Sequence, residues 1–211
     1  MYSFVTNKQE KKELRCACEQ IIKNVQRSSL REYFTFQFEL IGSGNLNILT
    51  KNGENGEYDL DYNLIIQKDK QGLIDNPKRI KDLFMKAFNE ANPTLGFKSP
   101  ENSTSVITSK LTYDNRLHFS FDVAIMCEGY DGDYLKIKYN RNNDLYYWNQ
   151  VKDSSGYKTK IKALKSMNLW VEAKERYLEK KNMYLKRNEE KASFSILLEV
   201  LKEMNDVYHL Y

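Results

Sequence analysis

The sequence predicts an α+β fold: a mixed, partly antiparallel sheet with flanking helices, followed by a C-terminal helical bundle. Alternating apolar and polar residues, typical of half-buried strands, recur between residues 33 and 127. Runs with the apolar spacing of helices flank and separate these strands, and from residue 157 onward the pattern is helical and strongly charged. We therefore expect two domains, residues 1–150 and residues 151–211.

The N-terminal part supplies a helix and two strands. Residues 7–27 carry apolar side chains at helical spacing. The run "YFTFQFELIG", residues 33–42, then alternates and ends at a glycine, and "EYDLDYNLII", residues 57–66, alternates in the same way. Because successive side chains of a strand point to opposite faces, Asp59 and Asp61 share the polar face of the second run.

Further elements follow in order along the chain. Asn76 and the proline after it predict the start of a helix that ends near residue 91. Residues 104–113 and 118–127 predict two strands joined by the polar turn "DNRL", and a short hairpin is expected around "NRNN".

The segment from Tyr157 onward predicts three helices. The clearest is the last, whose expected buried face is formed by Phe194, Leu197, Leu198, Leu201 and Met204.

Composition excludes several classes of protein. With 41% hydrophobic residues, 29% charged residues, three prolines and nine glycines, the chain is neither disordered nor fibrous. No apolar run approaches the roughly 18 residues of a membrane span, and the N-terminus does not resemble a secretion signal. The spacing of Cys16, Cys18 and Cys127 argues against a disulfide framework or a zinc site, so we expect reduced thiols and a cytoplasmic location.

The net charge of +4 is distributed unevenly. Residues 1–150 hold 20 basic and 20 acidic side chains, whereas residues 151–211 hold 13 and 9. The excess permits an anionic ligand near the C-terminal part, and solvated helix faces explain it equally well.

Three aspartates form the candidate site. Asp59 and Asp61 lie roughly 7 Å apart along one strand face, and Asp122 lies on the polar face of a later strand. If the two strands pair, the three carboxylates converge, and their repulsion raises the pKa of each. Hard divalent cations such as Mg²⁺ prefer carboxylate oxygens, and two such ions can activate an attacking hydroxyl and stabilise departing pyrophosphate. An exposed strand face explains Asp59 and Asp61 equally well when they are considered alone.

The "GSG" turn, Gly42 to Gly44, supplies a possible phosphate site. Glycines allow close approach of the backbone to an anion, and turn N–H groups together with the Ser43 hydroxyl can hold phosphate oxygens. Considered alone, the turn is a weak signal, and a plain strand-end turn is the favoured interpretation.

Together these residues resemble the nucleotidyltransferase superfamily typified by DNA polymerase beta, over about residues 33–127. "FDVAIM" around Asp122 and the helical C-terminal part look like the branch of oligoadenylate synthetases and bacterial cyclic-oligonucleotide synthases. The resemblance implies that Gly42 and Ser43 hold the triphosphate of an NTP such as ATP. It also implies that Asp59, Asp61 and Asp122 bind two Mg²⁺ ions, for which Mn²⁺ can substitute.

The implied activity is transfer of an NMP from an NTP to an acceptor hydroxyl with release of pyrophosphate. We expect a nucleotide or small-molecule acceptor; the end of an RNA, a protein side chain, or a catalytically silent nucleotide-binding module are the alternatives.

Two parts of the family pattern have uncertain counterparts. The connector of residues 45–57 is longer than is common, so Gly44 and Thr50 are matched loosely, and we expect a mobile loop there. Lys158, Lys162 and Lys165 are candidates for the basic residue that contacts the triphosphate, although a solvated basic helix face would give the same spacing.

Overall fold

A computed structural model describes residues 1–54, 56–114, 116–151 and 155–209. Contacts divide the chain into two compact units. The larger unit comprises Thr6–Asn45 and Glu57–Val151, and the smaller comprises Met1–Val5, Leu46–Gly56 and Lys152–Tyr211. The division at residue 150 stays a prediction; in addition, two N-terminal segments group with the C-terminal helices, which the sequence pattern did not suggest.

The larger unit contains a seven-stranded sheet. Its strands are β2 (Phe34–Ile41), β4 (Tyr58–Asp69), β5 (Glu101–Asn102), β6 (Ile107–Tyr113), β7 (Arg116–Glu128), β8 (Tyr134–Asn140) and β9 (Leu145–Gln150). The order is β2-β4-β7-β6-β5, with β8 also paired to β7 and β9 paired to β8. Among the strand pairs that the structure describes in this sheet, only β4–β7 is parallel, so the predicted mixed, partly antiparallel sheet is confirmed.

The helices of this unit begin at side-chain caps. They are α1 (Lys8–Arg27) and α3 (Pro77–Ala91), with the short elements η1 (Ser29–Glu32), α2 (Gly42–Leu46) and η2 (Asn92–Leu95). Asn7 accepts a hydrogen bond from the N–H of Glu10 and Asn76 accepts one from Arg79, which satisfies backbone donors that a first helical turn leaves unpaired. Both long helices therefore start where the sequence predicts.

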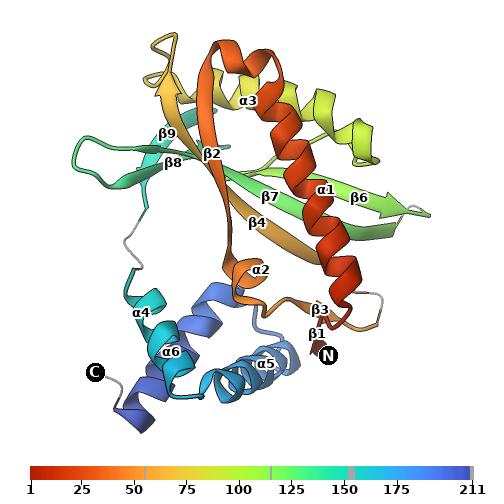
Figure 1. Cartoon of the computed structure of the whole chain (residues 1–211), viewed down its shortest axis with the longest axis vertical. Helices are drawn as coiled ribbons and strands as arrows, with labels where there is room; N and C mark the ends of the chain where they lie inside the picture. Colours follow the sequence, from red (N-terminus) through yellow and green to blue (C-terminus); the bar gives the residue numbers. More distant parts are fainter. Residues whose placement is uncertain (55, 115, 152–154, 210–211) are drawn as a thin grey trace. The chain divides into compact units, whose positions relative to one another are not determined.

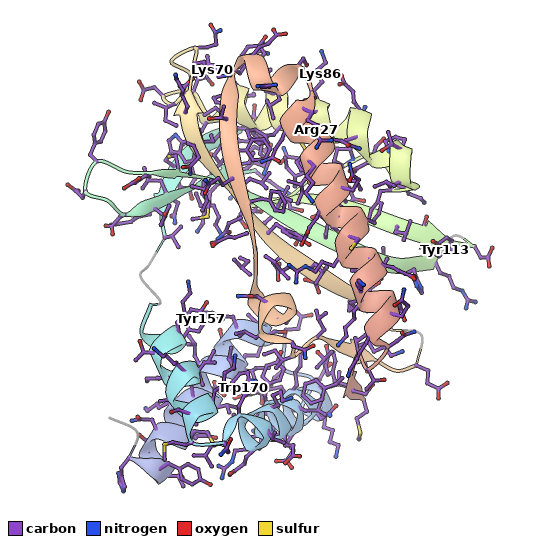
Figure 2. All side chains as sticks on the ribbon, in the orientation of Figure 1. Arg27, Lys70, Lys86, Tyr113, Tyr157 and Trp170 are labelled. Carbon is purple, nitrogen blue, oxygen red and sulfur yellow. The ribbon has the colours of Figure 1, made fainter. Side chains whose placement is uncertain are left out.

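Aromatic side chains join α3 to the apolar face of the sheet. The ring of Phe84 stacks on Phe34 with centroids 6.0 Å apart, and Phe88 packs against Phe121 at 6.3 Å. Helix α1 also contacts α3, and Figure 1 shows the two helices beside the sheet. Tyr113, the last residue of β6 before the turn into β7, projects outward and is 61% exposed (Figure 2). Because these helices cover the apolar face, the opposite, polar face of β4 and β7 carries the candidate site.

The smaller unit is a helical bundle with a two-stranded sheet. It contains β1 (Tyr2–Phe4), β3 (Thr50–Asn52), α4 (Ser155–Ser166), α5 (Trp170–Lys186) and α6 (Ser193–Tyr208). The two strands pair antiparallel, and the three predicted helices are confirmed. The buried residues of α6 are Ile196, Leu197, Val200, Leu201 and Met204.

Three local predictions are wrong. On α6, Phe194 and Leu198 are about 40% exposed, because the buried stripe runs through Ile196 and Val200 instead. The connector of residues 45–57 is not a plain loop, since it contains β3. The turn between β6 and β7 is shorter than "DNRL", because its last two residues already belong to β7.

No helix in the described ranges is long and apolar enough to span a lipid bilayer.

Candidate functional site

Strand pairing brings two of the three predicted aspartates side by side. In the parallel β4–β7 ladder Asp61 is the register partner of Asp122, and Asp59 is the partner of Ser120. The side chains of Asp61 and Asp122 therefore project from neighbouring positions on one sheet face, with Asp59 two residues along β4 on that face. We call these three residues the carboxylate patch.

Burial and mutual repulsion act on the carboxylate patch. The pKa of Asp61 is raised to about 7, first by desolvation and then by the charges of Asp59 and Asp122, while Lys136 opposes the rise. A carboxyl group with this pKa is only partly ionised near neutral pH. A cation held against it would favour the ionised form.

A hydroxyl group holds Asp122 in place. Thr108 on β6 is its cross-strand neighbour, and the Thr108 hydroxyl donates to Oδ1 of Asp122 at 2.6 Å. Burial raises the pKa of Asp122, and this hydrogen bond is the largest effect that opposes the rise. One carboxylate oxygen is thus oriented by the sheet itself.

The end of β2 lies beside the patch. Ile41, the last residue of β2, is the register partner of Asp61, and Gly42 follows with φ of +62°. A Cβ on Gly42 would lie 2.8 Å from Oδ2 of Asp61, so only glycine allows this approach. The predicted "GSG" turn is a single helical turn, α2, and it places Gly42 against the carboxylate, with Ser43 next along the chain.

The donor chemistry of the patch suits a divalent cation, but the geometry is not that of a preformed site. Carboxylate oxygens are the ligands that Mg²⁺ prefers, and a bound cation would oppose the rise in the pKa of Asp61 that burial and the charges of Asp59 and Asp122 cause. Among the described residues, however, no three His, Cys, Asp or Glu side chains are gathered closely enough to hold an ion as they stand. Metal binding by Asp59, Asp61 and Asp122 therefore remains a proposal.

Sequence reasoning missed the lysines whose charges act on the patch. Lys81 on α3 is 1% exposed, and Lys81 and Lys110 both oppose the rise in the pKa of Asp122. Lys136 on β8 acts in the same direction on Asp61. One signal was present, because Lys81 precedes the buried Phe84 and Phe88 by three and seven residues, the spacing of one helix face.

Other predicted residues belong to the smaller unit. Lys158, Lys162 and Lys165 are on α4 in the smaller unit, where the Lys165 ammonium lies 5.6 Å from the ring centroid of Trp170. The Thr50 hydroxyl accepts a hydrogen bond from Lys181 at 2.6 Å. The predicted contact of Lys162 and Lys165 with the triphosphate stays a prediction, as does any role for Thr50.

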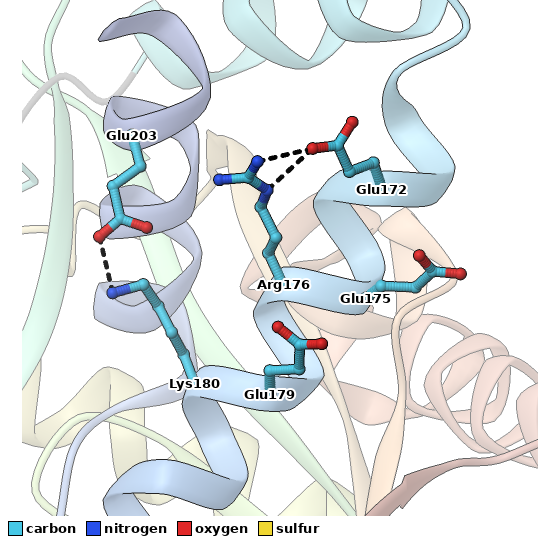
Figure 3. A pocket seen from close by; sticks show the side chains of 6 residues that line it. All are labelled: Glu172, Glu175, Arg176, Glu179, Lys180 and Glu203. Carbon is cyan, nitrogen blue, oxygen red and sulfur yellow. Dashed lines mark hydrogen bonds and ion pairs between the residues drawn. The ribbon is translucent and has the colours of Figure 1, made fainter. Parts of the chain in front are cut away.

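The smaller unit has a charged hollow of its own, of about 380 Å³ (Figure 3). It is lined by Glu172, Glu175, Arg176, Glu179, Lys180 and Glu203. Lys180 pairs with Glu203 at 2.7 Å, between α5 and α6, and Arg176 pairs with Glu172 at 2.7 Å. We interpret the hollow as a polar seam between helices.

Comparisons with known proteins agree with the fold. No protein-family model matches the sequence, and no curated protein matches it. Among solved structures, CdnE c-di-GMP synthase from Capnocytophaga granulosa matches 99% of this chain, with a TM-score of 0.63 and 16% identity. DncV from Vibrio cholerae, in its 3′-deoxy GTP bound form, matches 92% with a TM-score of 0.65 and 10% identity. The CD-NTase CdnG from Bradyrhizobium diazoefficiens, in complex with GTP, matches 76% with a TM-score of 0.54 and 17% identity.

The chain has the fold of the CD-NTases. The resemblance to the bacterial cyclic-oligonucleotide synthase branch is thus confirmed for the fold. The chain spans 64% of the CdnE chain, 65% of the DncV chain and 44% of the CdnG chain. The activity and substrates of those longer proteins are therefore matters for proposal.

Proposed function

We propose that this chain is a divalent-metal-dependent nucleotidyltransferase, which transfers an NMP from an NTP to an acceptor hydroxyl and releases pyrophosphate. The observation that carries the proposal is the register of β4 and β7, which places Asp61 beside Asp122 next to the Gly42 end of β2. The CD-NTase fold supports it, because the solved neighbours include complexes with GTP.

In this proposal the carboxylate patch would hold two Mg²⁺ ions, or Mn²⁺ in their place. When bound, the ions would supply Lewis-acid polarisation of the phosphate oxygens and offset the charge of the patch. Asp61 adjoins Asp122 in the parallel ladder and Asp59 follows on the same strand face, so these three residues would share the ligation.

The turn after β2 would bind the triphosphate. Gly42 brings the backbone within reach of the patch without a Cβ, and Ser43 supplies a hydroxyl directly after it. A Cβ on Gly44 would lie 2.6 Å from Cδ2 of Leu60, so glycine also lets this turn pack closely on β4. Backbone N–H groups in such a turn can donate to phosphate oxygens.

The chemical step is an in-line displacement. The acceptor oxygen forms a bond to the α-phosphorus while the bond from that phosphorus to the bridging oxygen of the β-phosphate breaks, and pyrophosphate leaves with that oxygen. The proton of the acceptor hydroxyl passes to Asp122, whose Oδ1 is oriented by the Thr108 hydroxyl.

We assign the acceptor to the nucleotide class, because the solved neighbours with this fold include a c-di-GMP synthase. The test is incubation with labelled NTPs, singly and in pairs, with Mg²⁺ or Mn²⁺, followed by pyrophosphate measurement and product identification. We expect metal-dependent pyrophosphate release with label in an oligonucleotide. Release that requires added RNA, protein or a small alcohol would move the acceptor to that class.

One observation favours a second candidate, a nucleotide-binding module without turnover. The described residues contain no ready-made group of three metal-ligating side chains. NTP binding by calorimetry with no pyrophosphate release under any metal would support this candidate.

A further inference from the structure

Lys81 is a charged side chain buried in the larger unit, and no part of the proposed chemistry uses it. It is 1% exposed, whereas the other buried polar residues of the described chain, Thr50, Asn92 and Ser109, are uncharged. Burying an ammonium group without a compensating negative charge is costly. The presence of Lys81 therefore requires a compensating interaction.

The sheet splits at the place where Lys81 reaches it. β4 pairs with one edge of β7; on the other edge β6 pairs as far as Val123 and β8 begins at Met126. The Lys81 ammonium donates to the carbonyl oxygen of Val106 at 2.9 Å, directly before β6. Two residues further on, Thr108 donates to Asp122, so the ammonium and the carboxylate lie at the same end of β6.

The charges of Lys81 and Asp122 act on each other. Burial lowers the pKa of Lys81 to about 8, and Asp122 is the group that opposes this fall, while Lys136 adds to it. Lys110 also acts on Asp122, but it is one-third exposed and is paired with Glu101 at 2.7 Å. Lys81 is thus the most deeply buried of the lysines whose charges act on the patch.

We propose that Lys81 is a built-in counter-charge for the carboxylate patch, a positioning residue that balances part of its negative charge when no divalent ion is bound. The ammonium recovers part of its own desolvation cost from Asp122. The positive charge of Lys81 in turn reduces the repulsion among the three carboxylates in the folded chain. The consequence for metal binding rests on the proposed function, but the charge coupling itself does not.

A double-mutant cycle measures the coupling without metal or nucleotide. The variants are Lys81→Met, Asp122→Asn and the double variant, unfolded in urea at pH 7 with chelator present. Met keeps the apolar stem of lysine, and Asn keeps an oxygen that can accept from Thr108. We expect Lys81→Met to lower the unfolding midpoint of the native chain, and to leave it unchanged or raise it in the Asp122→Asn background, where the lysine has lost its partner.

Equal shifts of the midpoint in both backgrounds would overturn the proposal. If Lys81→Met does not fold, the same cycle is run with Lys81→Gln, which is neutral and keeps a donor. The matched control is Lys86→Met, an exposed lysine of the same helix (Figure 2), for which the shift should be the same in both backgrounds.

A second measurement adds Mg²⁺ alone. Because a cation replaces the missing charge, Mg²⁺ should raise the unfolding midpoint of Lys81→Met more than that of the native chain. A smaller rise would contradict the counter-charge role. A native chain that Mg²⁺ does not stabilise would contradict the proposed metal site, while the cycle, measured without metal, still decides the role of Lys81.

Discussion

Gly42 is a position where one added atom, a Cβ, would disturb the candidate site. Its φ of +62° is strained for other residues, and a Cβ would lie 2.8 Å from Oδ2 of Asp61. Gly53 has a similar φ of +78°, but a Cβ added there would have nothing within 4 Å. A substitution at Gly53 therefore introduces backbone strain without a steric contact.

Substitution of these two glycines separates the two effects. Gly42→Ala and Gly53→Ala should each lower the free energy of unfolding by about 1 kcal/mol or more, because alanine disfavours positive φ. Only Gly42→Ala should also reduce pyrophosphate release, since it displaces Asp61. Urea unfolding and the turnover assay measure both quantities, and equal turnover in the two variants would contradict the placement of Gly42 in the site.

The raised pKa of Asp61 predicts a particular dependence of stability on pH. Its pKa is 3.8 in the unfolded chain and about 7 in the folded chain, so between these values the folded state binds more protons. The contribution of Asp61 to stability is therefore present at low pH and is lost as pH rises from about 4 to about 7. Without metal, the native chain should lose more stability over this range than Asp61→Asn. Urea unfolding between pH 4.5 and 8 measures this, and identical slopes would contradict it.

The residues of the patch were predictable from alternation, and their charged neighbours were not. Asp59, Asp61 and Asp122 stand out because each occupies a polar position in a run of alternating apolar and polar residues. Such positions share the strand face opposite the apolar side chains. Lys81 has the spacing of a buried face, but its charge made an exposed position the natural expectation. The bond from Thr108 to Asp122 depends on the register of β6 against β7, which no local pattern encodes.

At the scale of elements, helix α6 carries both a buried and an exposed leucine. Leu201 is 1% exposed and Leu198 is 41% exposed. Both positions fit an apolar stripe in the sequence, so only packing separates them. The predicted buried face was partly wrong because apolar residues cover a broad part of this helix. Their spacing does not decide whether the stripe includes Phe194 and Leu198 or Ile196 and Val200.

This packing difference is testable by truncation. Leu201→Ala should lower the free energy of unfolding by about 2–5 kcal/mol, because it leaves a cavity in the core of the bundle. Leu198→Ala should change it by no more than about 0.5–1 kcal/mol. Urea unfolding of the two variants makes the comparison, and similar losses would mean that α6 presents a different face to its core.

A side chain of α5 binds the backbone of the N-terminal strand. Asn182 accepts a hydrogen bond from the N–H of Tyr2 at 2.6 Å and donates one to the Tyr2 carbonyl oxygen at 3.1 Å. β1 has only three residues, so these two hydrogen bonds add to a short ladder with β3. Three-residue strands are too short for alternation to reveal, which is why β3 was expected to be loop.

Hydrogen exchange tests the contribution of Asn182. Asn182→Ala should increase the exchange rate of backbone amides in β1 and β3, because both bonds to Tyr2 are lost. Amides of α3, in the other unit, should exchange as before and serve as the internal control. Unchanged protection in β1 would show that the ladder with β3 holds the strand by itself.

For the molecule as a whole, the periodic patterns of the sequence predicted the fold class, but they did not predict which segments group together in each compact unit. The alternating runs led to the mixed sheet, and helical periodicity led to the three C-terminal helices. The grouping of residues 1–5 and 46–56 with those helices depends on contacts far apart in sequence, such as Lys181 with Thr50. Such contacts follow from tertiary packing, which periodicity does not report.

The most direct test of the central claim is pyrophosphate release from NTPs with Mg²⁺ by the native chain and by Asp122→Asn. Loss of one carboxylate of the proposed metal site should reduce the rate by roughly 100-fold or more, because several kcal/mol of transition-state stabilisation is removed. Glu39→Gln is the matched control, an exposed carboxylate that accepts a hydrogen bond from Asn63 on the same sheet face. Its rate should equal that of the native chain. Equal rates in Asp122→Asn and the native chain would contradict the account.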